Sequence, residues 1–188
     1  MRRGYLSVVE TSNERLRARA PARPFHLLLV EPEIPPNTGN IARLSAATGC
    51  PLHLVGPLGF RIDEHAVRRA GLDYWHLVEL HQHRTFAEAE SNIAAARLDR
   101  RRGRAHLFSG KSRRSYLDVD FAPGDLLVFG RESVGLPEAL LAEREVDTVA
   151  IPLLGPVRSL NLSNAVSIAL YEALRRIGAL AAATLTEP

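Results

Sequence analysis

The stretch FHLLLV at residues 25–30 is an almost uninterrupted apolar run. Strands with this composition are typically buried on both faces of a parallel sheet, because helices cover both faces. Pro32, Pro35 and Pro36 follow closely and predict a loop after the strand. The folded part of the chain is therefore predicted to begin with a buried strand at Phe25.

Short apolar runs alternate with helical patterns downstream of this strand. We expect further strands at 52–55, 75–80, 105–108, 126–129 and 148–151, and helices at 40–48, 63–70 and 86–97. The last helix has the clearest period, with apolar residues three or four positions apart at Leu162, Val166, Ala169, Ala173 and Ile177 before Gly178. The alternation implies βαβ units and an α/β fold, with a mostly parallel sheet and helices on both faces.

The length and composition fit one globular domain. The chain has 188 residues, of which 46% are hydrophobic and 24% charged, which excludes collagen-like, disordered and disulfide-rich classes. It shows neither an apolar run long enough to span a bilayer nor a recognisable signal peptide. Cys50 is the single cysteine, which fits a reducing compartment and argues against a Cys-rich zinc or iron–sulfur site. We therefore expect a soluble cytoplasmic protein without a membrane partner.

Positive charge is concentrated at the start of the chain. Residues 1–24 contain six arginines and two glutamates, a balance of +4 against +3 for the whole chain. They show no helical or strand period, so we interpret residues 1–24 as a flexible basic arm, residues 25–180 as the folded domain and residues 181–188 as a tail. A second basic run covers residues 97–114. These runs favour RNA or another phosphate-rich partner, although a solvated surface would also explain them.

Several common sites are absent from the sequence. No G-x-G-x-x-G follows the first strand and no G-x-x-x-x-G-K-[ST] occurs, which argues against a standard dinucleotide or nucleoside triphosphate site. Neither the H-E-x-x-H of zinc proteases nor the G-x-S-x-G of serine hydrolases occurs. His76, His81 and His83 lack a paired cysteine or carboxylate at ligand spacing, so we expect no metal site.

Three loops after predicted strands carry unusual residues. The first, EPEIPPNTGNIAR at residues 31–43, places Asn40 and Arg43 three positions apart on the next helix, where a guanidinium can bind a phosphate. In the plainer interpretation, Asn37 only caps that helix, Gly49 ends it, and Arg43 is a surface residue.

The other two loops follow the predicted strands at 126–129 and 148–151. In FGRESVGLP, residues 129–137, two glycines permit close approach of the backbone to a ligand and Glu132 adds a carboxylate, although a plain turn also fits. The stretch 151–164 carries more polar residues than one helix cap needs: Ser159, Asn161, Ser163 and Asn164. Ligands of parallel sheets bind beyond the carboxyl ends of the strands, where all three loops are expected.

In this order, the three loops resemble the three motifs of the SPOUT superfamily of RNA methyltransferases. These motifs are P-x-N-x-G-N-x-x-R, F-G-x-E-x-x-G-L-P, and I-P followed by R-S-L-N-L-S-N-A. The stretch RRAGLDY at residues 68–74 further resembles the family that methylates the 2′-hydroxyl of the tRNA wobble nucleotide, cytidine or uridine. The resemblance covers residues 25–178.

The resemblance implies a particular architecture and cofactor. The last strand and helix would thread into a deep trefoil knot, and two chains would pair through their first and last helices, with the small residues Ala165, Ala169 and Ala173 at the contact. The cofactor would be S-adenosylmethionine, held in the knot by five residues: Phe108, Gly130, Ile151, Ser159 and Leu160.

By the same resemblance, further residues take part in catalysis and RNA binding. The catalytic residues are Arg43, Asn40, Glu132 and Asn164, and the RNA-binding residues are Asn37, Arg68, Arg69, Tyr74 and Lys111. A guanidinium stays protonated at neutral pH and is a poor general base. We therefore expect Arg43 to hold the target phosphate and stabilise the developing alkoxide, while the proton leaves through water organised by Asn40 and Glu132.

Two alternatives to tRNA wobble methylation stay open at this point. The first is the same chemistry on ribosomal RNA or at another tRNA site, because the motifs specify the reaction more firmly than the substrate. The second is a knotted RNA-binding assembly factor without catalysis, against which the intact Asn40, Arg43 and Glu132 count. Binding of S-adenosylmethionine would separate this second alternative from an enzyme.

Overall fold

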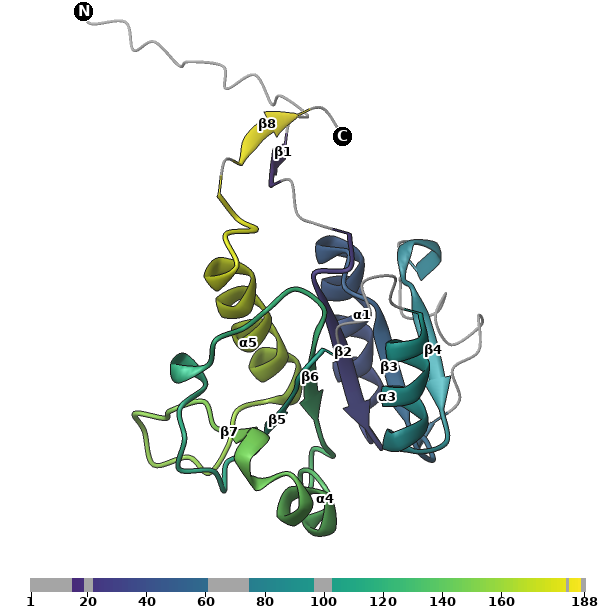
Figure 1. The fold of residues 1–188 in the computed structure, drawn as a ribbon, viewed down its shortest axis with the longest axis vertical. Coiled ribbons are helices and arrows are strands. Elements are labelled where there is room, and N and C mark those ends of the chain that lie inside the picture. The colour runs from purple at the N-terminus through teal and green to yellow at the C-terminus, as the bar shows by residue number, and fades with distance from the viewer. Residues whose placement is uncertain (1–14, 19–21, 61–74, 97–102, 182, 187–188) are drawn as a thin grey trace, which may run out of the picture.

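The computed structural model describes residues 15–18, 22–60, 75–96, 103–181 and 183–186 (Figure 1). In chain order, its strands (β), α-helices (α) and 3-10 helices (η) are β1 (Arg15–Arg17), β2 (Phe25–Val30), α1 (Pro35–Thr48), β3 (Leu52–Val55), η1 (Trp75–Leu77), β4 (Leu80–His83), α3 (Phe86–Ala95), β5 (Ala105–Phe108), η2 (Tyr116–Asp118), β6 (Asp125–Phe129), α4 (Glu138–Glu143), η3 (Glu145–Asp147), β7 (Thr148–Val149), α5 (Leu162–Arg176) and β8 (Thr184–Thr186). Within these ranges, no helix is long and apolar enough to cross a membrane.

Six parallel strands form the central sheet, in the order β4-β3-β2-β6-β5-β7. The strand β2 lies inside the sheet between β3 and β6, with Leu28 opposite both His53 and Val128. All residues of β2 are buried, as the apolar run predicts. The expected α/β fold with a mostly parallel sheet is confirmed.

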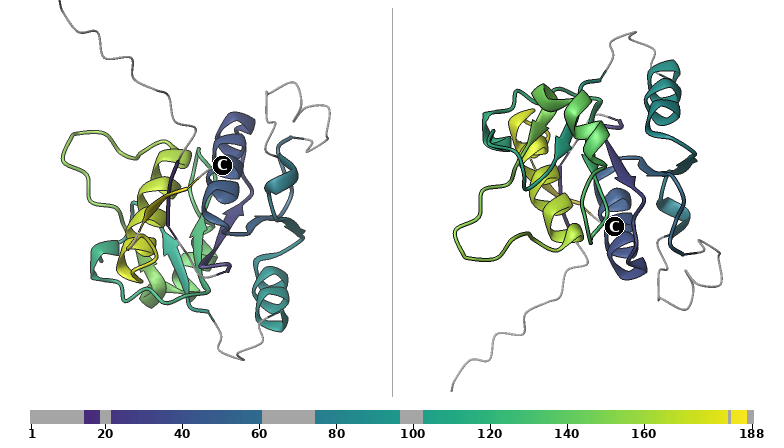
Figure 2. Two further views of the ribbon diagram at one scale, coloured as in Figure 1. Left: turned by 90° about the horizontal axis from the view of Figure 1, so that it is seen from above. Right: turned by 90° about the horizontal axis from the view of Figure 1, so that it is seen from below.

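Alternate residues of β2 point to opposite faces of the sheet. Leu27 and Leu29 belong to one apolar core, which α1 and α5 cover. Leu28 and Val30 belong to a second core, which α3 and α4 cover. Figure 2 shows the two pairs of helices on either side of the sheet. The prediction of helices on both faces is therefore confirmed.

The prediction of a strand at residues 75–80 is wrong. Trp75–Leu77 forms the 3-10 helix η1, and the strand β4 comes later, at Leu80–His83. There it pairs in parallel with β3 at the edge of the sheet. The mostly polar segment LHQH therefore forms the edge strand. The apolar Trp75 lies outside the sheet and packs against the core.

Helix α1 begins at Pro35, earlier than the predicted start at Asn40. The prediction of Asn37 as the N-cap is therefore wrong, because Asn37 lies in the first turn of the helix. The N-cap position is occupied by Ile34, which makes no side-chain hydrogen bond. Proline is tolerated in a first turn because its missing N–H would have no partner within the helix. Gly49 ends the helix in a left-handed conformation with φ of 65°, as predicted.

The other predicted elements that the structure describes agree closely with it. The strands expected at 52–55, 105–108, 126–129 and 148–151 correspond to β3, β5, β6 and β7, and the helix expected at 86–97 corresponds to α3. The last predicted helix is α5, and Gly178 follows it with φ of 73°. The helix expected at 63–70 lies outside the described residues.

A short ladder joins the two flanking parts of the chain outside the central sheet. The strand β1 pairs antiparallel with β8, with Leu16 opposite Leu185. No pattern in residues 1–24 or 181–188 predicts these strands. The division into arm, domain and tail stays a prediction.

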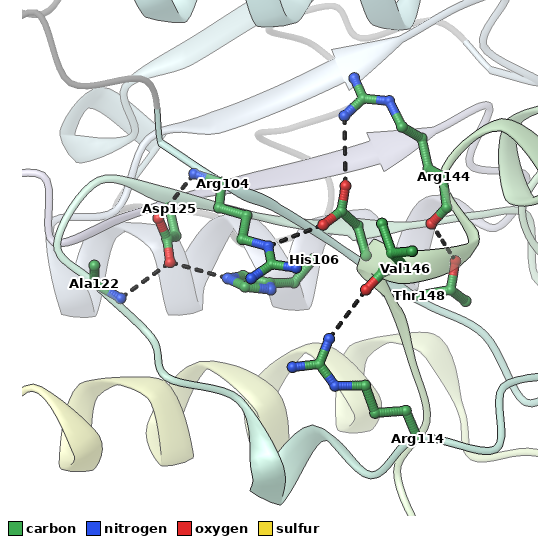
Figure 3. A network of polar contacts seen from close by, with 9 residues as sticks. Arg104, His106, Arg114, Ala122, Asp125, Arg144, Val146 and Thr148 are labelled. Atoms are coloured by element: carbon green, nitrogen blue, oxygen red, sulfur yellow. Dashed lines mark hydrogen bonds and ion pairs between the residues drawn. The ribbon is translucent and has the colours of Figure 1, made fainter.

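A buried carboxylate anchors the connection between β5 and β6, residues 109–124 (Figure 3). Asp125 accepts hydrogen bonds from His106 Nε2 at 2.9 Å, the Arg104 amide at 2.9 Å and the Ala122 amide at 3.0 Å. Burial alone would raise the pKa of this carboxyl, but the hydrogen bonds outweigh burial and hold the pKa below its ordinary value. The end of the connection is therefore fixed by a charged hydrogen-bond acceptor.

Three buried histidines form a hydrogen-bonded row across β2, β3 and β4. His53 Nε2 lies 2.9 Å from His26 Nδ1, and His53 Nδ1 lies 2.9 Å from His83 Nε2. The Asn92 side-chain amide of α3, 3.4 Å from His83 Nδ1, can donate to the end of the row. His83 and His53 then accept at Nδ1 and donate at Nε2, and His26 accepts at Nδ1. Acceptance at Nδ1 requires all three rings to be neutral. Burial and the neighbouring histidines lower the pKa of His53 to about 2.

We expect this row to make the fold less stable in mild acid. In the unfolded chain a histidine titrates at about pH 6.5. Folded His53 stays neutral to about pH 2, so unfolding between these values takes up a proton. The free energy of unfolding should therefore be highest above about pH 6.5 and fall below it by up to about 1.4 kcal/mol per pH unit. Urea unfolding at several pH values between about 7.5 and 5 would measure the slope.

Two variants serve as comparison and control for this slope. His53→Gln, which keeps a donor and an acceptor but cannot titrate, should show a shallower slope. His76→Gln, at an exposed position in η1, should keep the slope of the unsubstituted chain. Equal slopes in all three proteins would contradict the prediction.

Candidate functional site

A cleft of about 610 Å³ lies at the carboxyl ends of β5, β6 and β7. The loops after these strands and the first turns of α1 and α5 line it. All five residues predicted to hold the cofactor are among its lining: Phe108, Gly130, Ile151, Ser159 and Leu160. The volume is in the range of pockets that bind small organic molecules.

Part of the lining of this cleft is aromatic. Phe108 and Phe129 are the last residues of β5 and β6, and their rings stack with centroids 4.6 Å apart. Both side chains are buried. Stacked rings in the lining of the cleft can pack against an aromatic or aliphatic part of a ligand.

The loop after β6 closes tightly on itself. The Arg131 amide donates to Gly135 O at 3.1 Å, and the Gly135 amide, with φ of 79°, donates to Arg131 O at 2.9 Å. A Cβ atom on Gly130 would lie 2.2 Å from both Gly135 C and Leu136 N, so only glycine fits there. An ion pair between Arg131 and Glu31 joins this loop to the residue that follows β2.

Glu132, in the same loop, holds the start of α1. Its carboxylate accepts hydrogen bonds from the Glu33 amide at 2.8 Å, the Ile34 amide at 3.3 Å and Asn37 Nδ2 at 2.9 Å. The first N–H groups of a helix have no partner within it, and the helix dipole favours a negative charge beside them. Because Ile34 supplies no side-chain cap, Glu132 takes this role from a distant part of the chain.

Asn37 extends this contact to the start of α5. Its Oδ1 accepts a hydrogen bond from Asn161 Nδ2 at 2.9 Å. Asn161 Oδ1 in turn accepts from the Ser163 amide at 2.9 Å and the Ser163 hydroxyl at 2.7 Å, and so caps α5. One continuous chain of hydrogen bonds therefore connects all three sequence motifs through Glu132, Asn37 and Asn161, which also line the cleft.

Lys111, which is predicted to bind RNA, also lines the cleft. Of the residues predicted to act in catalysis or RNA binding, Asn37 and Glu132 line it as well. It follows β5, and its Nζ lies 2.8 Å from Glu138 Oε1 at the start of α4. The hydrogen bond and charge of Lys111 lower the pKa of Glu138. The ammonium group thus stands at the rim of the cleft, on the side of α4.

Three predicted catalytic residues do not line the cleft of their own chain: Asn40, Arg43 and Asn164. All three are exposed, the first two on α1 and the third in the first turn of α5. One chain by itself therefore does not place the predicted catalytic arginine in its own cleft. The remaining predicted RNA-binding residues lie outside the described residues: Arg68, Arg69 and Tyr74.

Sequence reasoning missed the central position of Asn161. The sequence identifies it only as one of several polar residues before the last helix, and it predicts Asn37 as a cap rather than as a partner of Glu132. Asparagine two positions before Ser163 is a capping signal, but no pattern along the chain indicates a contact between residues 124 positions apart. In the part of the chain that the structure describes, no group of three or more His, Cys, Asp or Glu could hold a metal ion.

The comparison with protein families agrees with this architecture. The model of the SpoU rRNA Methylase family matches residues 24–171, and the chain belongs to this family. A curated relative from Acidovorax sp. is named tRNA (cytidine(34)-2'-O)-methyltransferase. It is 44% identical over 168 residues, which cover 87% of this chain and 99% of the relative. The resemblance predicted from the motifs is confirmed.

Solved structures support the same assignment. One, described as structural insights into the 2-OH methylation of C/U34 on tRNA, has a TM-score of 0.72 and 46% identity and covers 81% of this chain and 95% of that chain. Another is the SpoU methyltransferase AviRb from Streptomyces viridochromogenes in complex with the cofactor AdoMet. It has a TM-score of 0.69 and 26% identity and covers 86% of this chain and 62% of that chain.

Proposed function

We propose that this chain transfers a methyl group from S-adenosylmethionine to the ribose 2′-hydroxyl of the wobble nucleotide, cytidine or uridine, of tRNA. The observation that carries the proposal is the cleft in which all five predicted cofactor residues adjoin the hydrogen-bonded chain of the three motifs. The substrate follows from the relative whose name specifies cytidine 34 of tRNA and from its identity over most of both chains. A tRNA substrate implies action in the cytoplasm.

The cleft fits S-adenosylmethionine in size and in chemistry. It combines a volume of about 610 Å³ with stacked phenylalanines and with the tightly closed backbone of the loop at Gly130, where a Cβ atom has no room. S-adenosylmethionine, when bound, supplies a methyl group on a positively charged sulfur. Phe108 and Ile151 would pack against its apolar parts, and the backbone at Gly130, Ser159 and Leu160 would hold its polar edges.

Glu132 acts in this proposal as a positioning residue. Its carboxylate already accepts three hydrogen bonds from the start of α1, so it orients that helix instead of receiving the substrate proton. Arg43 lies further along α1 and holds the target phosphate, and its positive charge stabilises the alkoxide that develops on the ribose. The proton leaves through water beside Asn40, because a guanidinium is a poor base.

We also propose the C-terminal trefoil knot. The connection between β5 and β6, residues 109–124, lies against both ends of the segment that would thread it. Tyr116 N donates to Ala150 O at 3.0 Å just after β7, and Arg176 Nη2 at the end of α5 donates to Val119 O at 3.1 Å. In Figure 1 this connection crosses in front of α5. Contacts at both ends of the segment support a passage of the chain beneath the connection.

The third part of the proposal is a homodimer in which Arg43 and Asn40 of one chain serve the cleft of the other. Both residues are exposed on α1, which shares one face of the sheet with α5. The small residues Ala169 and Ala173, expected at the interface, are fully buried in the core of their own chain. The interface is therefore assigned to the exposed stripe of α5, which contains Asn164, Ile168 and Tyr171.

Mixing two inactive variants tests this shared site. Arg43→Ala removes the arginine, and Ser159→Trp fills the cleft, so each homodimer should be inactive. A mixed dimer combines the open cleft of one chain with the Arg43 of the other, so an equal mixture should recover about a quarter of the sites. Methyl transfer by the refolded mixture would measure this. If Arg43 served its own cleft, the mixture would recover no activity.

Methyl transfer to tRNA tests the function itself. We expect the protein to incorporate labelled methyl from S-adenosylmethionine into unmodified total tRNA, and nucleoside mass spectrometry after nuclease mapping should place a 2′-O-methylated pyrimidine at the wobble position. Incorporation into ribosomal RNA alone would overturn the proposal that tRNA is the substrate. If calorimetry detected no binding of S-adenosylmethionine, the proposed methyltransferase activity would be overturned.

A further inference from the structure

The ladder formed by β1 and β8 lies outside the family match, which begins at residue 24 and ends at residue 171. Figure 1 shows it beyond the C-terminal end of α5, apart from the central sheet. All residues of both strands are exposed. It brings together segments from the beginning and the end of the chain, so it is a separate element that the catalytic cleft does not use.

The two faces of this ladder differ in chemistry. Side chains alternate between the faces of a strand, and residues directly opposite each other share a face. One face therefore presents Arg15 and Arg17, with Thr186 and Thr184 opposite them. The other face presents the pair Leu16 and Leu185. Guanidinium and hydroxyl groups on one face form a surface rich in hydrogen-bond donors.

The ladder lacks the packing that would stabilise it on its own. Leu16 is 70% exposed and Leu185 is 64% exposed, so the apolar face buries little surface. A two-stranded ladder with so little packing is marginal in water. A bound partner would supply the missing stabilisation.

Charge indicates the chemistry of that partner. Residues 1–24 carry a balance of +4, so this part of the chain favours a polyanion. Arg15 and Arg17 are about 6.6 Å apart along an extended strand, which allows each guanidinium to bind a separate phosphate. The threonine hydroxyls on the same face can donate further hydrogen bonds to phosphate oxygens.

We propose that the ladder of β1 and β8 is a second tRNA-binding surface, which holds the phosphate backbone away from the methylated nucleotide. The proposal rests on tRNA being the substrate. The helix α5 begins at the cleft and ends near the ladder, and its 15 residues span about 22 Å. The ladder therefore adds affinity for tRNA without contacting the reacting atoms, and its contacts do not depend on the base sequence.

The test compares tRNA affinity across a range of salt concentrations. In the double variant Arg15→Gln/Arg17→Gln we expect about tenfold weaker binding near physiological salt, and a slope of log K against log salt that is shallower by about 1.4 to 1.8. The double variant Arg15→Lys/Arg17→Lys keeps the charge and should retain most of the affinity. Arg84→Gln, at an exposed arginine outside the ladder, serves as the matched control. Binding of S-adenosylmethionine should be unchanged in all variants.

The outcomes distinguish this proposal from the proposed function. Equal affinity and equal salt slope in the glutamine variant and the unsubstituted protein would overturn the ladder as a tRNA-binding surface. A change of oligomeric state in that variant, measured by light scattering, would assign the ladder to a second copy of the chain and also overturn it. Wobble methylation by the unsubstituted protein is measured separately, so either proposal can fail while the other stands.

Discussion

The Gly130→Ala variant is expected to lose S-adenosylmethionine binding by at least about 100-fold, and methyl transfer with it. The added Cβ would lie 2.2 Å from Gly135 C and from Leu136 N. Both atoms belong to backbone, so the loop must open, and its two hydrogen bonds between Arg131 and Gly135 cannot both persist. Calorimetric titration with S-adenosylmethionine measures the loss, and urea unfolding should show a destabilisation of about 1–3 kcal/mol from overpacking.

A second glycine-to-alanine change provides the control. Gly155, in the loop between β7 and α5, has no atom within 4 Å of the position of an added Cβ. Gly155→Ala should therefore change stability by no more than about 0.5 kcal/mol and leave cofactor binding nearly unchanged. Normal cofactor binding by Gly130→Ala would contradict the assignment of the cleft.

The Glu132→Ala variant is expected to lose methyl transfer by at least about 100-fold, because the start of α1 would no longer be fixed against the loop after β6. The change leaves three donors without their acceptor: the amides of Glu33 and Ile34 and the side chain of Asn37. Loss of a helix-capping carboxylate should lower the free energy of unfolding by about 2 kcal/mol. Urea unfolding and single-turnover methyl transfer measure the two effects.

The pH dependence separates positioning by Glu132 from proton transfer. In Glu132→Gln we expect a lower rate with the same shape of the pH–rate profile as in the unsubstituted protein. Loss of the limb on the acid side of that profile would instead identify Glu132 as the proton acceptor. Glu33→Ala is the matched control. The Glu33 carboxylate accepts a hydrogen bond from the Ser133 amide at 3.1 Å, and its loss should have a small effect.

Much of the fold could be predicted because local pattern and global packing agree. The apolar run at residues 25–30 is the buried strand β2, and the spacing of Leu162, Val166 and Ala169 follows the buried face of α5. The left-handed conformation at Gly49 ends α1 as its position predicts. In the site, all five residues predicted to hold the cofactor line one cleft, because each lies at or just after the carboxyl end of a strand or just before the last helix.

The incorrect predictions share a cause, which is that a distant contact overrides a local preference. The strand at 75–80 is displaced to β4 because pairing with β3 determines which residues form the edge strand. The start of α1 moves to Pro35, where Glu132 supplies the cap that no nearby residue provides. Neither the preference of asparagine for caps nor the apolar character of Trp75 contains information about these partners.

By itself, the sequence determined the α/β class, the positions of most strands and helices, the three motifs and the membership of the family that they indicate. The class and the elements depend on periodicity and spacing, which act over a few neighbouring residues, whereas the family follows from the resemblance of the motifs. Only the tertiary structure decided that Glu132 reaches Asn37 across 95 positions and that Asn37 reaches Asn161 across 124. It also decided that Asn40 and Arg43 do not line their own cleft and that β1 pairs with β8. The contacts of Glu132 and Asn161 with Asn37 arise from the order of the strands in the central sheet, because that order brings loops from distant parts of the chain to one edge.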